Sequence, residues 1–313
     1  MLKLLVNPLA RGAYYGDLLE VAEAELRLFF PECELTIEQC GPLTFLNVSL
    51  DEEALPELAK MSFVQGIFEP LEEGMRCLDV LPRFRFPEQI VWGAKYRGKT
   101  HELVTQMAIN IGLKVCDNDM TKPLLLLDPM AGRGTTLFWA LRYGLSAWGI
   151  EQDKSALQHL QRHVKRQTKL HRLKHKQLQG SIGKRRKDGS GRFLEFQFGK
   201  QSLQLVTGDS RDVRSLISNR KFHLLVSDLP YGVQFTSPEG KRNPLEVLKA
   251  CAPGWVESLR PDGVMVLIFN ALQPKREDLI EIFENEGLVL HPFSAPHRMS
   301  ESIKRDFLVM QRT

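Results

Sequence analysis

The chain has 313 residues, of which 43% are hydrophobic, enough for a buried core in about two domains. No apolar run is long enough to span a bilayer, and we expect no signal peptide, because the N-terminal segment has only a short apolar patch. The five cysteines are scattered without a CxxC pair, which argues against a disulfide framework or a zinc site and predicts a cytoplasmic protein without a metal.

The formal net charge of +4 conceals an asymmetry along the chain. Residues 1–120 carry 11 Lys and Arg against 19 Asp and Glu, so this part has a net charge of −8 and the remainder of +12. A basic half indicates an anionic partner. The alternative is a solvated basic face that binds nothing.

Residues 1–80 are predicted to form a small α/β or α+β domain. Helical spacing predicts helices over 16–30 and 51–60, and short apolar runs predict strands over 3–7, 34–39, 43–50 and 63–68. Residues 81–93 mix proline and glycine with an irregular pattern, which predicts a linker.

A basic loop at residues 95–100 opens a predicted helix over 103–113. Lys99 and Thr100 lie at its start, where cationic and helix-terminal contacts hold a carboxylate or a phosphate. An ordinary helix start capped by Thr100 is the alternative.

Strands and helices alternate from residue 121 onward, which predicts a parallel sheet with right-handed crossovers. The predicted strands are 124–127, 147–150, 203–207, 224–227 and 264–269, and the helices are 135–144, 154–169, 244–259 and 276–286. Segments 288–293 and 307–311 are predicted to close the sheet as an antiparallel pair.

A basic segment over 162–200 interrupts this alternation with 13 Lys and Arg, opposed only by Asp188 and Glu195. It contains the run Lys184, Arg185, Arg186 and Lys187. We expect a flexible insertion that contacts a phosphate backbone, with a disordered, solvated loop as the alternative.

Acidic residues follow the predicted strands in order. Asp128 ends the first strand, Glu151 the second and Asp228 the fourth, and Asp209 follows the third. The carboxyl ends of parallel strands form the ligand crevice of an open sheet, so these acids are expected to converge. The alternative is that each is only a cap or a turn former. A glycine turn follows Asp128 and consists of Pro129, Met130, Ala131, Gly132, Arg133, Gly134 and Thr135.

Two motifs carry a family resemblance. DPMAGRGTT resembles the glycine-rich first motif of S-adenosylmethionine-dependent methyltransferases, and SDLPYG resembles the (D/N)PPY motif of enzymes that methylate exocyclic amines of bases. Together they are most similar to the THUMP-type tRNA guanine-N2 methyltransferases, and KYRGKTHELVTQMAINIGL resembles the helix before their first motif. The resemblance implies a Rossmann-like class I methyltransferase domain over 94–313 and a THUMP-related N-terminal domain that positions RNA.

The resemblance also implies a binding site for S-adenosyl-L-methionine. Glu151 would accept the ribose hydroxyls, Asp209 the adenine amine with Ser210 nearby, and the loop of Lys99 and Thr100 would hold the carboxylate. The cofactor-binding set is Lys99, Thr100, Asp128, Pro129, Met130, Ala131, Gly132, Gly134, Thr135, Glu151, Asp209 and Ser210.

The second motif supplies the expected catalytic group. Asp228 and the Leu229 carbonyl would accept the hydrogens of the amine, Pro230 would fix the backbone, and Tyr231 would stack on an extruded base. Leu229 stands where the family pattern usually has proline. His223, His291 and His297 are expected to have structural roles or to lie at the surface.

The predicted function is therefore RNA N-methylation, with a guanine amine in tRNA as the substrate. One alternative is a DNA adenine-N6 or cytosine-N4 methyltransferase, whose motif is also DPPY-like. The other is a non-catalytic RNA-binding protein of the same fold.

Overall fold

The computed structural model of the chain describes residues 1–7, 15–82, 84–92, 101–116, 123–183, 190–230, 236–237, 240–241 and 243–313. Some predicted site residues lie outside these ranges, namely Lys99, Thr100, Lys184, Arg185, Arg186, Lys187 and Tyr231. The chain divides into two compact units. One comprises Met1–Arg83 with Ser294–Lys304, and the other comprises Phe84–Phe293 with Arg305–Thr313.

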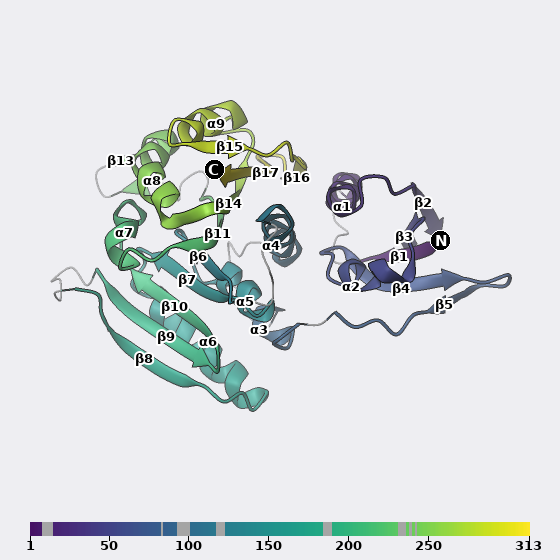
Figure 1. Cartoon of the computed structure of the whole chain (residues 1–313), viewed down its shortest axis with the longest axis horizontal. Helices are drawn as coiled ribbons and strands as arrows, with labels where there is room; N and C mark the ends of the chain where they lie inside the picture. The colour runs from purple at the N-terminus through teal and green to yellow at the C-terminus, as the bar shows by residue number, and fades with distance from the viewer. Residues whose placement is uncertain are drawn as a thin grey trace. The chain divides into compact units, whose positions relative to one another are not determined.

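The first unit is built on an antiparallel sheet with the strand order β2-β3-β1-β4-β5 (Figure 1). Its elements are β1 (Leu2–Val6), α1 (Tyr15–Phe29), β2 (Leu35–Cys40), β3 (Leu43–Val48), η2 (Glu52–Ala54), α2 (Leu55–Leu58), β4 (Val64–Pro70) and β5 (Met75–Cys77). Apart from β5, this is a split β-α-β-β-α-β arrangement. Its core includes Leu4, Leu26, Phe45 and Leu46. The helix predicted over 51–60 is shorter than expected, because η2 and the single turn of α2 take its place.

The second unit is built on a sheet with the strand order β15-β17-β14-β11-β6-β7-β10-β9-β8. Its core strands are parallel and comprise β6 (Leu125–Asp128), β7 (Ser146–Glu151), β10 (Gln201–Thr207), β11 (Phe222–Asp228) and β14 (Leu259–Asn270). β17 (Ile303–Arg312) lies antiparallel to both β14 and β15 (Leu288–Leu290). The predicted α/β fold class, with a Rossmann-like parallel core and a closing antiparallel pair, is confirmed.

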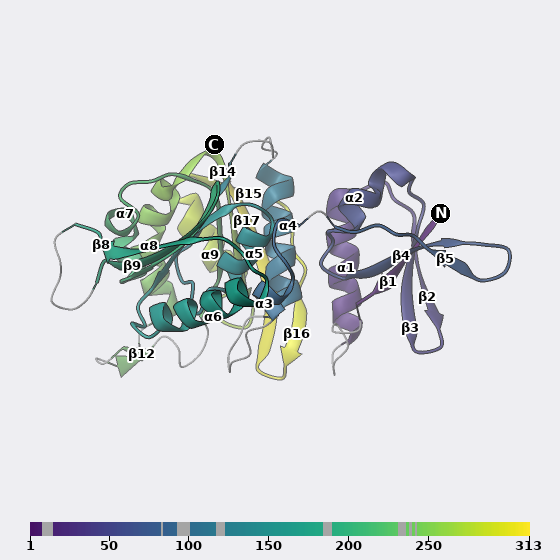
Figure 2. The same cartoon turned by 90° about the horizontal axis from the view of Figure 1, so that it is seen from below.

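Helices cover both faces of this sheet (Figure 2). One group is α3 (Gln89–Trp92), α4 (Glu102–Cys116), α5 (Thr135–Arg142) and α6 (Ala156–Leu170), and the other is α7 (Val213–Leu216), α8 (Pro244–Ser258) and α9 (Arg276–Glu284). Alternate strand residues face opposite groups. Leu224 of β11 lies against Gly112 of α4, whereas Leu225 belongs to the buried cluster that contains Trp255 of α8. The strands are therefore apolar on both sides, as in a buried parallel sheet.

The expectation of a flexible basic insertion is wrong for most of 162–200. The segment consists of the end of α6 and a hairpin of β8 (Lys176–Ser181) and β9 (Arg192–Phe198), and β9 pairs with β10 to extend the main sheet. Leu194, Phe196 and Phe198 are buried at alternate positions of β9. This period-two pattern favours a strand, and the surrounding charges conceal it in the sequence.

The remaining elements are short. They are η3 (Ser210–Asp212), the hairpin of β12 (Thr236–Ser237) and β13 (Gly240–Lys241), and β16 (His297–Ser300), which pairs with β17. In the parts of the chain that the structure describes, no helix is both long enough and apolar enough to cross a membrane.

Candidate active site

The predicted acids lie at one edge of the parallel sheet. Asp128, Glu151 and Asp228 are the last residues of β6, β7 and β11, and Asp209 follows β10. Because these strands are parallel neighbours in the order β10-β7-β6-β11, their carboxyl ends share this edge. The sequence shows only the order of these acids along the chain, and the structure places them at one edge of the sheet.

The glycine turn is held against the end of β7. The Ala131 N–H donates to the Ile150 carbonyl at 2.9 Å, and Gly132 and Gly134 have φ angles of +53° and +88°, a region that favours glycine. A Cβ at Gly132 would have nothing within 4 Å, so the turn has open space beside it. A Cβ at Gly149 of β7 would lie 2.7 Å from the Ala131 Cβ. The turn can therefore lie this close to β7 only because residue 149 is a glycine.

Glu151 links the turn to the following loop. Its Oε2 accepts from the Gly132 N–H at 2.9 Å and its Oε1 from the Asp153 N–H at 2.8 Å. Burial raises the pKa of this carboxyl, and the backbone hydrogen bonds oppose that rise. Each oxygen has a second lone pair, so the carboxylate can hold the turn and still accept from a ligand.

Asp128 is directed into the protein. It is 2% exposed, and its Oδ1 accepts from the Ser227 hydroxyl at 2.7 Å and from the Met130 N–H at 3.1 Å. Burial raises its pKa to about 7, against the effect of the Ser227 and Thr136 hydroxyls. Asp128 thus fastens the turn after β6 to the end of β11, one residue before Asp228. Thr135 is also buried at the start of α5.

Asp209 and Ser210 already have protein partners. The Arg211 guanidinium donates to Asp209 Oδ1 at 3.0 Å and to Oδ2 at 2.6 Å. Both side chains are more than a third exposed, so this ion pair is weak and easily exchanged. The Ser210 hydroxyl accepts from the Trp255 indole N–H at 3.0 Å, so it anchors α8.

Asp228 pairs with a buried arginine. Arg305 of β17 is 4% exposed, and its Nη2 donates to Asp228 Oδ2 at 3.2 Å. The neighbouring Asp306 binds Arg276 at 2.9 Å, which fixes this part of β17 to the start of α9. The Leu229 N–H donates to the Ile268 carbonyl at 2.8 Å, and its side chain is buried. Pro230 follows at an intermediate level of burial.

Four residues of this site were missed by the sequence reasoning: Gly149, Arg211, Ser227 and Arg305. A glycine inside an apolar strand and a serine just before the motif aspartate were usable signals for Gly149 and Ser227. Arg305 carries no local signal, because its partner lies 77 residues earlier in the chain. Among the described residues, no group of three or more His, Cys, Asp or Glu side chains is placed to hold a metal ion.

No protein-family model and no curated protein sequence matches the chain. Solved structures do resemble it. TrmN from Thermus thermophilus matches 90% of this chain with a TM-score of 0.47 and 14% identity, and the chain spans 60% of the length of that protein. PH1948 of Pyrococcus horikoshii, described as a candidate RNA methyltransferase, matches 74% of this chain and 91% of its own with a TM-score of 0.43 and 16% identity.

A TehB-like S-adenosylmethionine-dependent methyltransferase from Corynebacterium glutamicum matches 64% of this chain and 92% of its own, with a TM-score of 0.38 and 16% identity. At these identities the matches concern the fold alone. The second unit has a mixed α/β sheet with a parallel core closed by antiparallel β17, an arrangement typical of class I methyltransferases.

Proposed function

We propose that the chain is an S-adenosylmethionine-dependent methyltransferase that acts on the exocyclic amine of an RNA base, with a guanine of tRNA as the substrate. The observation that carries the proposal is the placement of Asp228 at the end of β11, beside the strand whose end carries the glycine turn. The carboxylate also pairs with Arg305, so a transfer assay, and not the presence of Asp228, separates an enzyme from a binding protein of the same fold.

The residues at the sheet edge fit S-adenosylmethionine. The space beside Gly132 admits a ligand close to the backbone, and Glu151 at the end of β7 would accept from ribose hydroxyls. Asp209 would exchange its exposed pairing with Arg211 for the adenine amine. When bound, the cofactor supplies an electrophilic methyl group on a sulfonium sulfur.

Asp228 and its neighbours would orient the nucleophile. An exocyclic amine is a poor nucleophile because its lone pair is delocalised into the base. Hydrogen bonds from the amine to the Asp228 carboxylate and the Leu229 carbonyl draw electron density toward the nitrogen. Arg305 holds the carboxylate in one place, and alignment of this kind lowers the barrier without covalent help.

The positive charge of the second unit supports a nucleic-acid substrate. Exposed cations lie along α6 and β8, including Arg162, Lys165, Arg166, Lys169 and Lys176. The run from Lys184 to Lys187 lies between β8 and β9 in the sequence. Phosphate contacts from such side chains supply affinity that is independent of sequence. The second motif also suits DNA methyltransferases, so tRNA is proposed because the motifs together are most similar to the THUMP-type tRNA guanine-N2 methyltransferases.

Methyl transfer from labelled S-adenosylmethionine separates the candidate functions. We expect label in total tRNA and none in genomic DNA, and Asp228→Ala abolishes the transfer while cofactor binding persists. Label in DNA alone would establish the DNA methyltransferase, and cofactor binding without transfer to either acid would favour the non-catalytic reader of RNA.

A further inference from the structure

A pocket of about 420 Å³ lies at the starts of β11 and β14, and β11 carries Asp228 at its opposite end. It is lined by Lys221, His223, Arg260, Pro261, Asp262 and Gly263. Lys221 and His223 flank the start of β11, whose other end is Asp228, and residues 260–263 belong to the start of β14. The pocket therefore shares no residue with the proposed methyl-transfer site.

The backbone around the pocket is shaped to present Arg260. Phe222 pairs with Leu259 and Leu224 with Val264, so residues 260–263 bulge out of the ladder between the two strands. Asp262 has a φ of +60°, and a Cβ at residue 263 would lie 2.9 Å from the Arg260 carbonyl oxygen. The bulge thus requires a glycine there and turns the arginine out of the strand.

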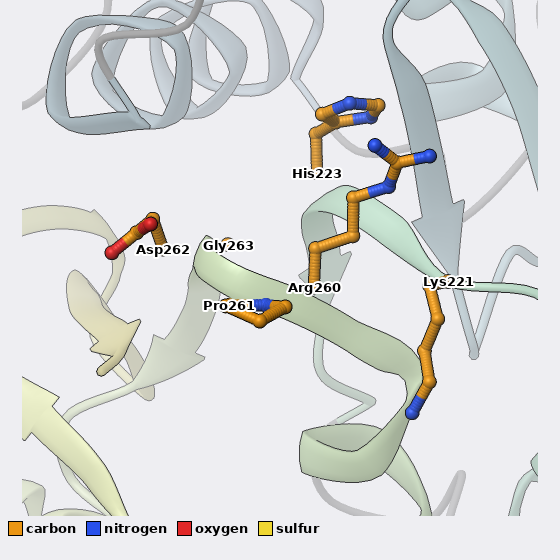
Figure 3. Close-up of a pocket in the computed structure, with 6 residues that line it drawn as sticks. All are labelled: Lys221, His223, Arg260, Pro261, Asp262 and Gly263. Atoms are coloured by element: carbon orange, nitrogen blue, oxygen red, sulfur yellow. The ribbon is translucent and has the colours of Figure 1, made fainter.

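Figure 3 shows the Arg260 guanidinium beside the His223 ring, with the Asp262 carboxylate turned away from both. Among the described residues the Arg260 side chain makes no hydrogen bond or ion pair, and it is exposed. His223 Nδ1 accepts from the Leu125 N–H at 3.0 Å, so the neutral ring carries its proton on Nε2 and is a donor there. In the part of the chain that the structure describes, two donors thus adjoin each other without an acceptor between them.

The surroundings of the pocket are also basic. Lys221 donates to the Glu257 carbonyl, and its ammonium points away from the His223 ring (Figure 3). Burial and the positive charges of Arg214 and Arg312 lower its pKa. The Glu257 carboxylate forms an ion pair with Arg214 at 3.1 Å. Burial lowers the pKa of His223 as well, and the adjoining Arg260 lowers it further. Positive groups placed together in this way favour an anion.

We propose that this pocket binds a phosphate group, held by the guanidinium fork of Arg260 and the Nε2–H of His223. Arginine binds phosphate oxygens through two parallel hydrogen bonds, and a planar fork suits a tetrahedral anion. The volume exceeds the needs of one phosphate and falls within the range of small-molecule sites, so the phosphate is expected to be part of a larger molecule. The phosphate belongs either to the backbone of bound RNA or to a free phosphorylated compound.

Titration calorimetry at constant ionic strength tests the proposal with inorganic phosphate and a nucleoside monophosphate. We expect binding to the wild type, weakened at least tenfold by Arg260→Gln and also by His223→Gln. Lys249→Gln removes the same charge from an exposed position on α8 and should change nothing. Absence of phosphate binding, or equal binding by wild type and Arg260→Gln, would overturn the site.

A second arm identifies the source of the phosphate. If it belongs to RNA, Arg260→Gln weakens tRNA binding and reduces the slope of log affinity against log salt by about 0.7–0.9. If it belongs to a free compound, tRNA binding is unchanged while nucleoside monophosphate binding is lost. Neither experiment measures methyl transfer. The phosphate-binding result can therefore be interpreted even if the proposed methyltransferase activity is not found.

Discussion

The ion pair between Asp228 and Arg305 predicts that Asp228→Ala destabilises the fold in addition to stopping methyl transfer. Arg305 is 4% exposed, so loss of the Asp228 carboxylate leaves a buried cation without that counter-charge. Removing one partner of a buried pair costs about 3 kcal/mol. For a unit of this size, that cost lowers the melting temperature by about 6–12 °C.

Differential scanning calorimetry on four proteins tests this reasoning: wild type, Asp228→Ala, Arg305→Met and the double variant. The double variant should be more stable than Asp228→Ala, because methionine removes the buried charge and fills the strand. If the two substitutions lower the melting temperature additively, or if Asp228→Ala has the same melting temperature as the wild type, the Asp228 and Arg305 side chains are not energetically coupled. In that case Arg305 does not hold the carboxylate.

Other substitutions test the remaining parts of the site. Glu151→Gln should weaken S-adenosylmethionine binding about tenfold by calorimetry, because a charged acceptor is lost; unchanged affinity would remove Glu151 from the site. Arg211→Ala frees Asp209 from an exposed pair and should tighten cofactor binding about two- to fivefold, whereas weaker binding would mean that Arg211 itself holds the ligand. The pKa of Asp128 is raised from 3.8 to about 7, so the folded form holds its proton over a range where the unfolded chain has lost it. The stability that the protonated Asp128 contributes is therefore lost as pH rises from about 4 to about 7. Between pH 5 and pH 7.5, the free energy of unfolding of wild type, measured in urea, should fall by about 2–3 kcal/mol relative to that of Asp128→Asn. Parallel pH profiles of the two proteins would contradict this. Replacing all four residues from Lys184 to Lys187 with glutamine should weaken tRNA binding and flatten its salt dependence, and an unchanged slope would exclude phosphate contacts there.

Local patterns predicted most of the second unit. The parallel strands, their helices and the antiparallel tail follow from apolar runs, glycine stops and alternation, which act within about fifteen residues. The order of acids at strand ends was visible for the same reason. The β8–β9 hairpin was missed because high charge concealed the alternate burial of Leu194, Phe196 and Phe198.

Long-range pairings could not be predicted from the sequence. The Arg305–Asp228 pair joins residues 77 positions apart, and the Asp128–Ser227 hydrogen bond spans 99. Both depend on which strands become neighbours and on how far each side chain is buried. The pairing of Asp209 with Arg211 was local but ambiguous, since an aspartate before an arginine equally suits a cap, a surface pair or a ligand.

Mass spectrometry of nucleosides tests the central proposal most directly. Total tRNA is incubated with the protein and S-adenosylmethionine that carries a deuterated methyl group, then digested to nucleosides. The proposal predicts a deuterated methyl on the exocyclic amine of guanosine with wild type and none with Asp228→Ala. A deuterated methyl found only on a ring nitrogen, a ribose oxygen or a carbon would contradict the role assigned to Asp228.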